Sequence, residues 1–446
     1  EPVEDVGHPL LARRLLELNR TRLRPYTGTD HYLLMNGVDH IEAQDDLLDI
    51  LDTLNDELPE GDWISQDTMP SYMAQVRAAL SDPDVYRGEM RHGGRRNLLA
   101  GTLSSRVYLK QQNVGCQALV EHLLEPLAVL AAWKGVRAYP AGFLRHLWKT
   151  LMMNHAHDSI CGCSRDEVHR HMMDRFARVG EIGRDLLARC GAGLAARVAR
   201  DGAEPDDALL VVANTLLAPR DGVVRMEIDF PRGQGVREIE ILDSAGRRVP
   251  CDRLDRRETV RAVTSPLNLP GYMEVDRFRI AFQADDVPAM GYARWIVRPA
   301  ASGDNAGDRS GTPAAPGLNP AACALENRWL SATLHPDGSL DLLDKVGGNL
   351  FPGLLRLEDR EDIGDSYIHE SAGLPPVVGD GTGFRVLRTE AGQVARSMTF
   401  AYSLSIPDCF LTAARRRSGR RIRMPVEVTL ALDGDERFLR VSIRID

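Results

Sequence analysis

The stretch Asn154-His155-Ala156-His157-Asp158-Ser159-Ile160-Cys161-Gly162-Cys163-Ser164 is the densest run of polar, metal-competent side chains in the sequence. On a regular helix His155 and His157 lie about 200° apart, so both cannot bind one ion from the same face. At most one of them is expected to be a ligand. From these residues alone, a polar helix end and half of a metal or catalytic site are equally good interpretations.

Helical patterns flank this stretch on both sides. Apolar residues recur at three- and four-residue spacing over residues 72–80, 107–133, 143–153 and 168–198. Ser164 and Glu167 have the spacing of a capping box, with Ser164 as the N-cap. Gly162 suits the left-handed residue that closes the preceding helix. We therefore predict an α-helical bundle as the middle domain, over residues 63–202.

The first 62 residues resemble the end of a β/α domain. An amphipathic helix is predicted over residues 8–22, followed by the apolar run Tyr32-Leu33-Leu34-Met35 and a second, Leu-rich helix from Asp45. The apolar run stops abruptly in Asn36-Gly37-Val38-Asp39-His40. A strand that enters a Gly-containing loop before a helix is where parallel α/β folds present catalytic side chains.

From about Asp206 onward the apolar period changes from 3.6 to 2. Segments 223–228, 277–280, 294–297 and 438–443 are strand-like, and turn signals such as Pro336-Asp337-Gly338 separate such strands. Residues 203–446 are therefore predicted to form an antiparallel β-sandwich region. Within it, residues 300–320 are rich in Gly, Ala, Pro, Ser and Asp, which is typical of a flexible linker.

Composition excludes several classes of protein. The 446 residues include 55 Lys+Arg and 64 Asp+Glu, a formal charge of −9, and 43% are hydrophobic. This balance argues against general disorder, and against nucleic acid or an anionic membrane as a main partner. No stretch approaches about 18 uninterrupted apolar residues. The seven scattered cysteines favour a reducing, cytoplasmic location, and Cys161 and Cys163 are better interpreted as small packed thiols than as a metal pair.

The central stretch, preceded by Trp148-Lys149 and followed by Asp166-Glu167-Val168-His169, closely resembles a signature of glycoside hydrolase family 38, in its bacterial branch. These are retaining, zinc-dependent α-mannosidases. The resemblance continues in the segments 34–40, 88–92 and 103–110, and more weakly in 326–327, 337–340 and 364–367. The histidine that precedes Asp in the family motif is a zinc ligand, and it falls on His157.

The resemblance implies a catalytic β/α domain, a helical middle domain and C-terminal β-sandwich domains, in the order that periodicity predicts. The general acid/base of the family falls on Asp39, for which a helix-capping turn residue is the alternative. Tyr367, His40 and Arg91 are the expected substrate contacts. For Tyr367 the alternative is a core tyrosine, and for Arg91, as for Arg106, it is a structural salt bridge. Zinc would hold sugar hydroxyls, as a template and Lewis acid.

The family's remaining zinc ligands, a His-x-Asp and an Asp that also serves as nucleophile, have no counterpart here. His335-Pro336-Asp337 lies in a turn pattern, which explains it without a metal. We therefore expect a member truncated at its N-terminus, inactive in isolation, with Asp39 and His157 about 6–12 Å apart in one cleft.

The predicted substrate is an α-mannoside. Mannosylglycerate or its phosphorylated form is the alternative, and a non-catalytic carbohydrate-binding or structural remnant is the alternative of another class. A homo-oligomer is compatible with all three functions.

Overall fold

The computed structural model describes residues 9–37, 39–83, 85–87, 98–264, 269–300, 318–319 and 323–446. The chain divides into two compact units, Glu1–Met90 and Arg91–Asp446, which are described separately below. Most of the predicted linker 300–320 lies outside the described residues, as does Arg91.

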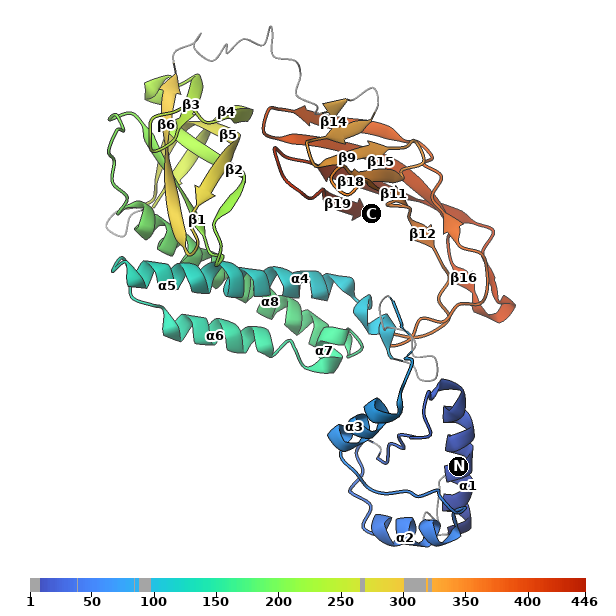
Figure 1. Ribbon diagram of the computed structural model, residues 1–446. Coiled ribbons are helices and arrows are strands. Elements are labelled where there is room, and N and C mark those ends of the chain that lie inside the picture. Colours follow the sequence, from blue (N-terminus) through green and yellow to red (C-terminus); the bar gives the residue numbers. More distant parts are fainter. Residues whose placement is uncertain are drawn as a thin grey trace. The chain divides into compact units, whose positions relative to one another are not determined.

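The first unit is helical in its described part (Figure 1). Helices α1 (Pro9–Leu23) and α2 (Leu47–Glu57) confirm the two predicted helices, and η1 (Arg24–Tyr26) and α3 (Met69–Ala79) complete the unit. The strand predicted at residues 32–35 is wrong, since these residues lie in no helix or strand and Met35 is 78% exposed. A buried strand needs neighbours for its N–H and C=O groups, and the described residues of this unit provide none.

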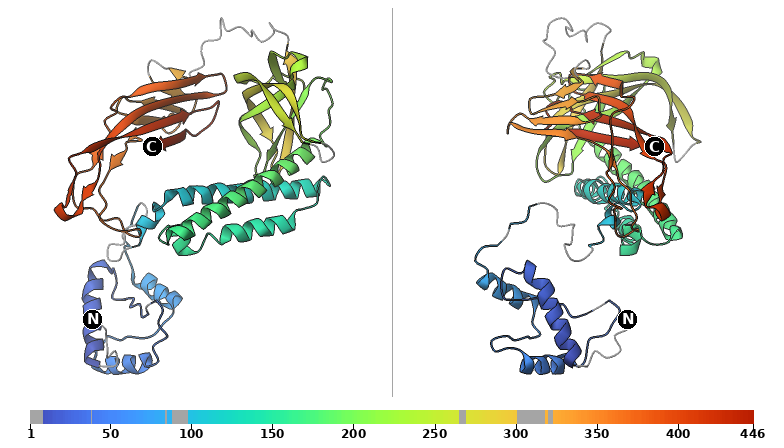
Figure 2. Two further views of the ribbon diagram at one scale, coloured as in Figure 1. Left: turned by 180° about the vertical axis from the view of Figure 1, so that it is seen from behind. Right: turned by 90° about the vertical axis from the view of Figure 1, so that its right-hand side faces the viewer.

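The second unit begins with a helical bundle, which starts at Ala100, later than the predicted start at residue 63, because α3 belongs to the first unit. It consists of η2 (Ala100–Leu103), α4 (Val107–Gln117), the π-helical segment η3 (Ala118–Leu124), α5 (Glu125–Trp133), α6 (Ala141–Met152), α7 (His157–Cys161) and α8 (Asp166–Ala195). Helices α4 and α5 lie along α8, and α6 packs beside them (Figure 2). The core consists of fully buried side chains such as Leu109, Leu147 and Phe176, as the apolar spacing predicts.

The start of α8 differs from the prediction. The capping box is wrong, because the N-cap of α8 is Arg165 and no side chain caps that helix. The amide of Ser164 donates instead to the carbonyl of Asp158 at 3.2 Å, and the helix begins one residue later than predicted.

The continuous helical run Val107–Trp133 is long and apolar enough to cross a membrane by length and composition alone. A buried bundle helix meets the same criterion, and this run contributes Leu109, Val120 and Leu124 to the core.

The β part of the second unit consists of two antiparallel sandwiches, which confirms the predicted class. The first β region (208–300) contains β1 (Ala208–Asn214), β2 (Arg220–Pro231), η4 (Arg232–Gln234), β3 (Glu238–Leu242), β4 (Cys251–Val263), β5 (Gly271–Val287) and β6 (Gly291–Ala300). Its sheets have the orders β1-β6-β3 and β2-β5-β4. Buried side chains of both sheets, including Ile241, Trp295, Phe278 and Phe282, form one core between them.

The C-terminal β region (323–446, with β7) has sheets of order β11-β10-β9-β8-β7 and β14-β15-β18-β19 and the hairpins β12-β13 and β16-β17. Its core includes Leu325, Leu340, Phe400 and Val428. The strands are β7 (Leu318–Asn319), β8 (Ala324–Glu326), β9 (Leu330–Leu334), β10 (Leu340–Asp344), β11 (Asn349–Leu354), β12 (Glu358–Asp359), β13 (Val377–Val378), β14 (Arg385–Ala391), β15 (Arg396–Pro407), β16 (Phe410–Leu411), β17 (Arg416–Arg417), β18 (Arg421–Ala431) and β19 (Arg440–Ile445), with η5 (Thr412–Ala414).

Candidate functional site

The signature stretch forms a tight turn between α6 and α8, not a continuous helix. Helix α6 ends at Met152, and α7 is a single short helix that closes at Gly162 with φ of +80°. The amides of Cys163 and Ser164 both donate to the carbonyl of Asp158, at 3.2 Å each. A Cβ at Gly162 would lie 2.7 Å from the carbonyl oxygen of Ser105, so only glycine fits here.

Within this turn the three polar residues Asn154, His155 and His157 have different environments. Asn154 is fully buried and bonded to the carbonyl of Met172 and to Arg175, so its role is structural. The Nε2 of His155 lies 2.7 Å from the Oδ1 of Asn113 on α4. The side chain of His157 is 91% exposed, with its Nε2 3.6 Å from the Asp158 carboxylate. Of the two histidines, His157 is therefore the one with a ring free to meet a ligand.

A loop of the C-terminal β region, which we call the Tyr367 loop (361–374), reaches this turn. The amide of Gly101 donates to the carbonyl of Tyr367 at 3.0 Å, and the hydroxyl of Ser105 donates to the carbonyl of Ser366 at 2.6 Å. Interaction with Cys163 raises the pKa of the Tyr367 hydroxyl, and the negative charge of Asp158 adds to this. The Cys163 thiol itself lies 3.8 Å from the carbonyl and from the carboxylate of Asp158. Tyr367 is 36% exposed, so it is not a core tyrosine.

Internal hydrogen bonds shape the Tyr367 loop. The Asp365 carboxylate accepts from the amides of Tyr367 and Ile368 at 2.8 and 2.9 Å. At the base of the loop, Glu361 accepts from the hydroxyl of Ser371 and from the amide of Leu374. These hydrogen bonds lower the pKa of Glu361 to about 2.

The guanidinium of Arg417 lies 2.8 Å from the Glu361 carboxylate. The run Arg415-Arg416-Arg417 has the composition of a solvated loop, but Arg417 takes part in this ion pair, in which its side chain is 14% exposed. The pair gives the base of the Tyr367 loop a second support from β17.

Two described cations near the signature turn, Arg106 and Lys110, bond to backbone or carboxylate oxygens. Arg106 donates to the carbonyl of Gly162 at 3.1 Å and pairs with Asp166 at 2.8 Å. Lys110 donates to the carbonyls of Cys161 and Ser105, and burial lowers the pKa of its amine. Arg106 thus has the structural role that was the alternative to lining a cleft. His169 is buried in the first turns of α8, and this burial lowers its pKa.

Asp39 and His40 lie in the first unit, at a turn of the chain. Their side chains are 88% and 92% exposed, and the Asp39 carboxylate lies 3.3 Å from the Nε2 of His40. His40 has a φ of +64°, which a tight turn requires of it. Asp39 and His157 belong to different units, so their predicted separation stays a prediction. Arg91 lies outside the described residues.

The described residues alone do not fit a zinc ion. No group of three or more His, Cys, Asp or Glu side chains that could hold a metal occurs among them. A zinc site needs three or four protein ligands, and the signature turn offers His157 with Asp158 beside it. The His335-Pro336-Asp337 sequence is a hairpin turn, in which Asp337 accepts from the amide and hydroxyl of Ser339 and His335 pairs with Asp341.

Sequence reasoning named Tyr367 as a candidate but did not name Cys163 and Asp158 as the side chains that act on it. Periodicity and spacing are local signals, and the bundle and the Tyr367 loop come from distant parts of the chain. The resemblance of the segments 103–110 and 364–367 to one family was the signal that could have paired them.

Comparisons with known proteins agree with this picture. The family model described as "Alpha mannosidase middle domain" matches residues 97–194. A putative mannosylglycerate hydrolase of Halalkalibacterium halodurans is 26% identical over an alignment that covers 99% of this chain and 52% of the relative. Alpha-mannosidase 2C1 of Homo sapiens is 31% identical over 147 residues, or 33% of this chain and 13% of the relative.

Two solved structures share the fold. An alpha-mannosidase from Enterococcus faecalis superposes with a TM-score of 0.70 at 23% identity, over 97% of this chain and 52% of that one. A glycosyl hydrolase family 38 protein from the same organism gives a TM-score of 0.68 at 25% identity, over 98% and 53%. The chain therefore spans about half the length of these relatives. The resemblance read from the signature stretch is confirmed.

Proposed function

We propose that this chain, a bacterial-type member of glycoside hydrolase family 38, is part of an enzyme that hydrolyses α-mannosidic bonds. The observation that carries the proposal is the likeness to a mannosylglycerate hydrolase through 99% of the chain. The contact of the Tyr367 loop with the signature turn supports it. Asp158 is common to both sides of that contact: its carboxylate lies 3.6 Å from the exposed imidazole of His157, and its charge acts on the hydroxyl of Tyr367. Polar groups of these kinds suit a polyhydroxylated ligand.

Retention of configuration is part of the proposal. A retaining glycosidase needs one carboxyl group that protonates the leaving oxygen and a second that forms the glycosyl-enzyme. Asp39 is our candidate for the first, with His40 and Arg91 as contacts to the sugar. The nucleophile is not identified among the described residues. For residues 1–446 alone we therefore expect binding of the sugar without robust turnover.

We also propose zinc as the cofactor, with His157 as one ligand and the other ligands from outside the residues that the structure describes. Bound zinc would hold neighbouring sugar hydroxyls and polarise them. Asp158 would orient the His157 ring, as carboxylates beside metal-bound histidines commonly do. The seven free cysteines are consistent with a reducing, cytoplasmic location.

Mannosylglycerate is the second candidate substrate, because the relative that covers the most of this chain among those described above carries that name. A phosphorylated form is less well supported. Recognition of phosphate would need an available Arg or Lys, whereas Arg106 and Lys110 are held by backbone carbonyls and Asp166. A carbohydrate-binding role without catalysis is the alternative of another class.

The test compares hydrolysis of an aryl α-mannoside and of mannosylglycerate with zinc present, followed by proton NMR. With any turnover obtained, from this chain or from a longer protein that contains it, the α-anomer of mannose should appear first. Initial release of the β-anomer would overturn the retaining mechanism. Sugar binding with no turnover in a protein that holds a full set of zinc ligands would favour the binding module.

A further inference from the structure

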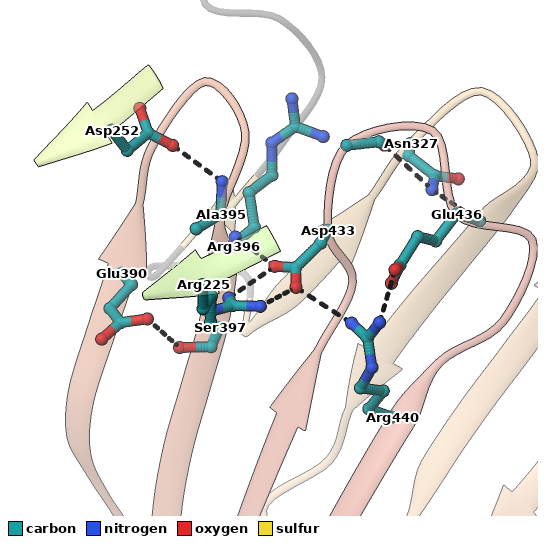
Figure 3. A network of polar contacts seen from close by, with 11 residues as sticks. Arg225, Asp252, Asn327, Glu390, Ala395, Arg396, Ser397, Asp433, Glu436 and Arg440 are labelled. Atoms are coloured by element: carbon teal, nitrogen blue, oxygen red, sulfur yellow. Dashed lines mark hydrogen bonds and ion pairs between the residues drawn. The ribbon is translucent and has the colours of Figure 1, made fainter. Parts of the chain in front are cut away.

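The C-terminal β region is joined to the first β region through a buried carboxylate, Asp433, in the turn after β18. Asp433 is fully buried, and the guanidinium of Arg225 on β2 makes a two-pronged ion pair with it, with one N···O distance of 2.8 Å (Figure 3). Arg440 and the amide of Arg396, from the same sheet as Asp433, donate to it at 3.0 Å each. Arg225 is thus the ion-pair partner of Asp433 that comes from the first β region.

A second carboxylate makes the reciprocal contact. Asp252 on β4 accepts hydrogen bonds from three successive amides, those of Gln393, Val394 and Ala395, at 2.9, 2.6 and 2.7 Å. These amides form the turn between β14 and β15. A Cβ on the neighbouring Gly392 would lie 2.1 Å from the Asp252 carboxylate, so the turn fits the carboxylate closely. Successive amides that converge on one anion form a strong and directional site.

We call these two carboxylate sites together the inter-sandwich contact: Asp252 with residues 393–395, and Arg225 with Asp433. The Tyr367 loop makes another contact of the same β region, against Gly101, Ser105 and Cys163 of the bundle. The first β region is in turn tied to the end of the bundle, since Arg294 on β6 donates to the carbonyl of Ala199. Bundle, first β region and C-terminal β region thus form a closed ring of contacts.

We propose that Arg225 and Asp252 are positioning residues for the Tyr367 loop. They hold the C-terminal β region on the first β region, and through the ring they keep Tyr367 against Cys163 and Asp158. In a closed ring each contact reduces the freedom that the others must restrict, so loss of one weakens the rest. The role of the loop in sugar binding rests on the proposed function, whereas the coupling itself does not.

The thiol of Cys163 reports the position of the loop directly. The loop is hydrogen-bonded to Gly101 and Ser105, and Tyr367 is close enough to Cys163 for the two side chains to interact, so departure of the loop should make the half-buried thiol more accessible. The native protein is treated with N-ethylmaleimide and the rate at Cys163 is measured by peptide mass spectrometry, relative to the exposed Cys409. All variants carry Cys161→Ser, because Cys161 would be recovered in the same tryptic peptide. The measurement needs neither sugar nor metal, so its failure is distinct from failure of the proposed function.

The test variants are Arg225→Gln and Asp252→Asn, with Tyr367→Phe as a positive control. The matched control is Arg277→Gln, which breaks an equivalent two-pronged Arg–Asp pair with Asp229, at 2.6 and 2.8 Å, inside the first β region. We expect the relative rate at Cys163 to rise by on the order of tenfold in both test variants, an ordinary coupling factor. Arg277→Gln should leave the rate unchanged.

Unchanged rates in both test variants, or an equal rise in Arg277→Gln, would overturn the proposal. Every rate is measured well below the melting temperature of the variant, so that a purely structural loss lowers the melting temperature without moving the ratio. If Arg225→Gln does not fold, Asp252→Asn and Gly392→Ala address the same contact from its other carboxylate. An unchanged ratio in those two would then overturn the proposal by itself.

Discussion

The amide of Gly101 donates a 3.0 Å hydrogen bond to the carbonyl of Tyr367, and through this bond a loop of the C-terminal β region is seated on the helical bundle. The two segments are in close contact: a Cβ at Gly101 would lie 2.8 Å from that carbonyl oxygen and 3.1 Å from the amide nitrogen of Ile368. Both neighbours are backbone atoms, which cannot move aside cheaply. The candidate site therefore depends on a glycine that has no chemistry of its own.

Gly101→Ala should consequently displace the Tyr367 loop and destabilise the second unit. Overpacking against fixed atoms costs roughly 1–3 kcal/mol, which thermal unfolding followed by circular dichroism will measure. The matched control is Gly115→Ala inside α4, where no atom lies within 4 Å of the added Cβ. That variant should be more stable than the wild type by about 0.5–1 kcal/mol, because alanine favours a helix. A Gly101→Ala variant as stable as the wild type would contradict the close contact between Gly101 and the Tyr367 loop.

Glu361 predicts a pH dependence for the same loop. Its pKa is lowered to about 2, first by the hydrogen bond from Ser371 and then by the amide of Leu374. A carboxyl group with a lowered folded-state pKa contributes stability that is present above its unfolded-state pKa, near 4.3, and is lost as the pH falls toward 2. Glu361→Gln should therefore be less stable than the wild type at pH 7, and the difference should shrink between about pH 4.5 and 2.

The measurement is the midpoint of urea unfolding at several pH values for both proteins. A difference that does not change across this window would show that Glu361 is not held as described. The control is Glu358→Gln, which removes an exposed carboxylate that pairs with Arg360 and lies in β12, before the loop.

Much of the architecture is predictable from the sequence, because helices and antiparallel strands have local apolar periods. The bundle helices and the hairpin at Pro336-Asp337-Gly338 follow from such patterns and are confirmed. Prediction failed where a neighbour decides the outcome. Residues 32–35 have strand-like composition but no strand partner among the described residues. Ser164 lies outside α8, and its amide donates to the carbonyl of Asp158.

The candidate site residues were named from the family resemblance, not from apolar periods. His157 and Tyr367 lie in segments that match family motifs, so they could be named individually. Their meeting could not be derived from spacing, because it depends on how the C-terminal β region docks on the bundle through Gly101 and Ser105. The structural role of Arg417 was missed because an arginine run has the composition of a solvated loop.

Zinc should bind residues 1–446 weakly. The signature turn contributes His157 and Asp158, fewer ligands than a zinc site requires. Isothermal titration should show sub-stoichiometric or weak binding that His157→Ala abolishes and that Cys161→Ser leaves unchanged. Stoichiometric zinc that survives dialysis would contradict this expectation, and its loss in Cys163→Ser would move the site to the thiols.

The second unit should fold without the first. The bundle and both sandwiches have their own buried cores, and the division between the units falls at Met90 and Arg91. A protein that begins at residue 98 should melt cooperatively, with the same near-ultraviolet circular dichroism from its buried aromatic residues. A non-cooperative transition would show that the first unit is needed for the fold of the second.

The central claim, recognition of an α-mannoside at a surface that includes His157 and Tyr367, is tested most directly by saturation-transfer NMR with methyl α-mannoside. This experiment detects weak binding and requires no turnover. We expect transfer to the mannoside with zinc present, weaker transfer to methyl α-glucoside, and a clear loss in both His157→Ala and Tyr367→Ala. Equal transfer to both sugars, or transfer to the mannoside that neither substitution changes, would contradict the account.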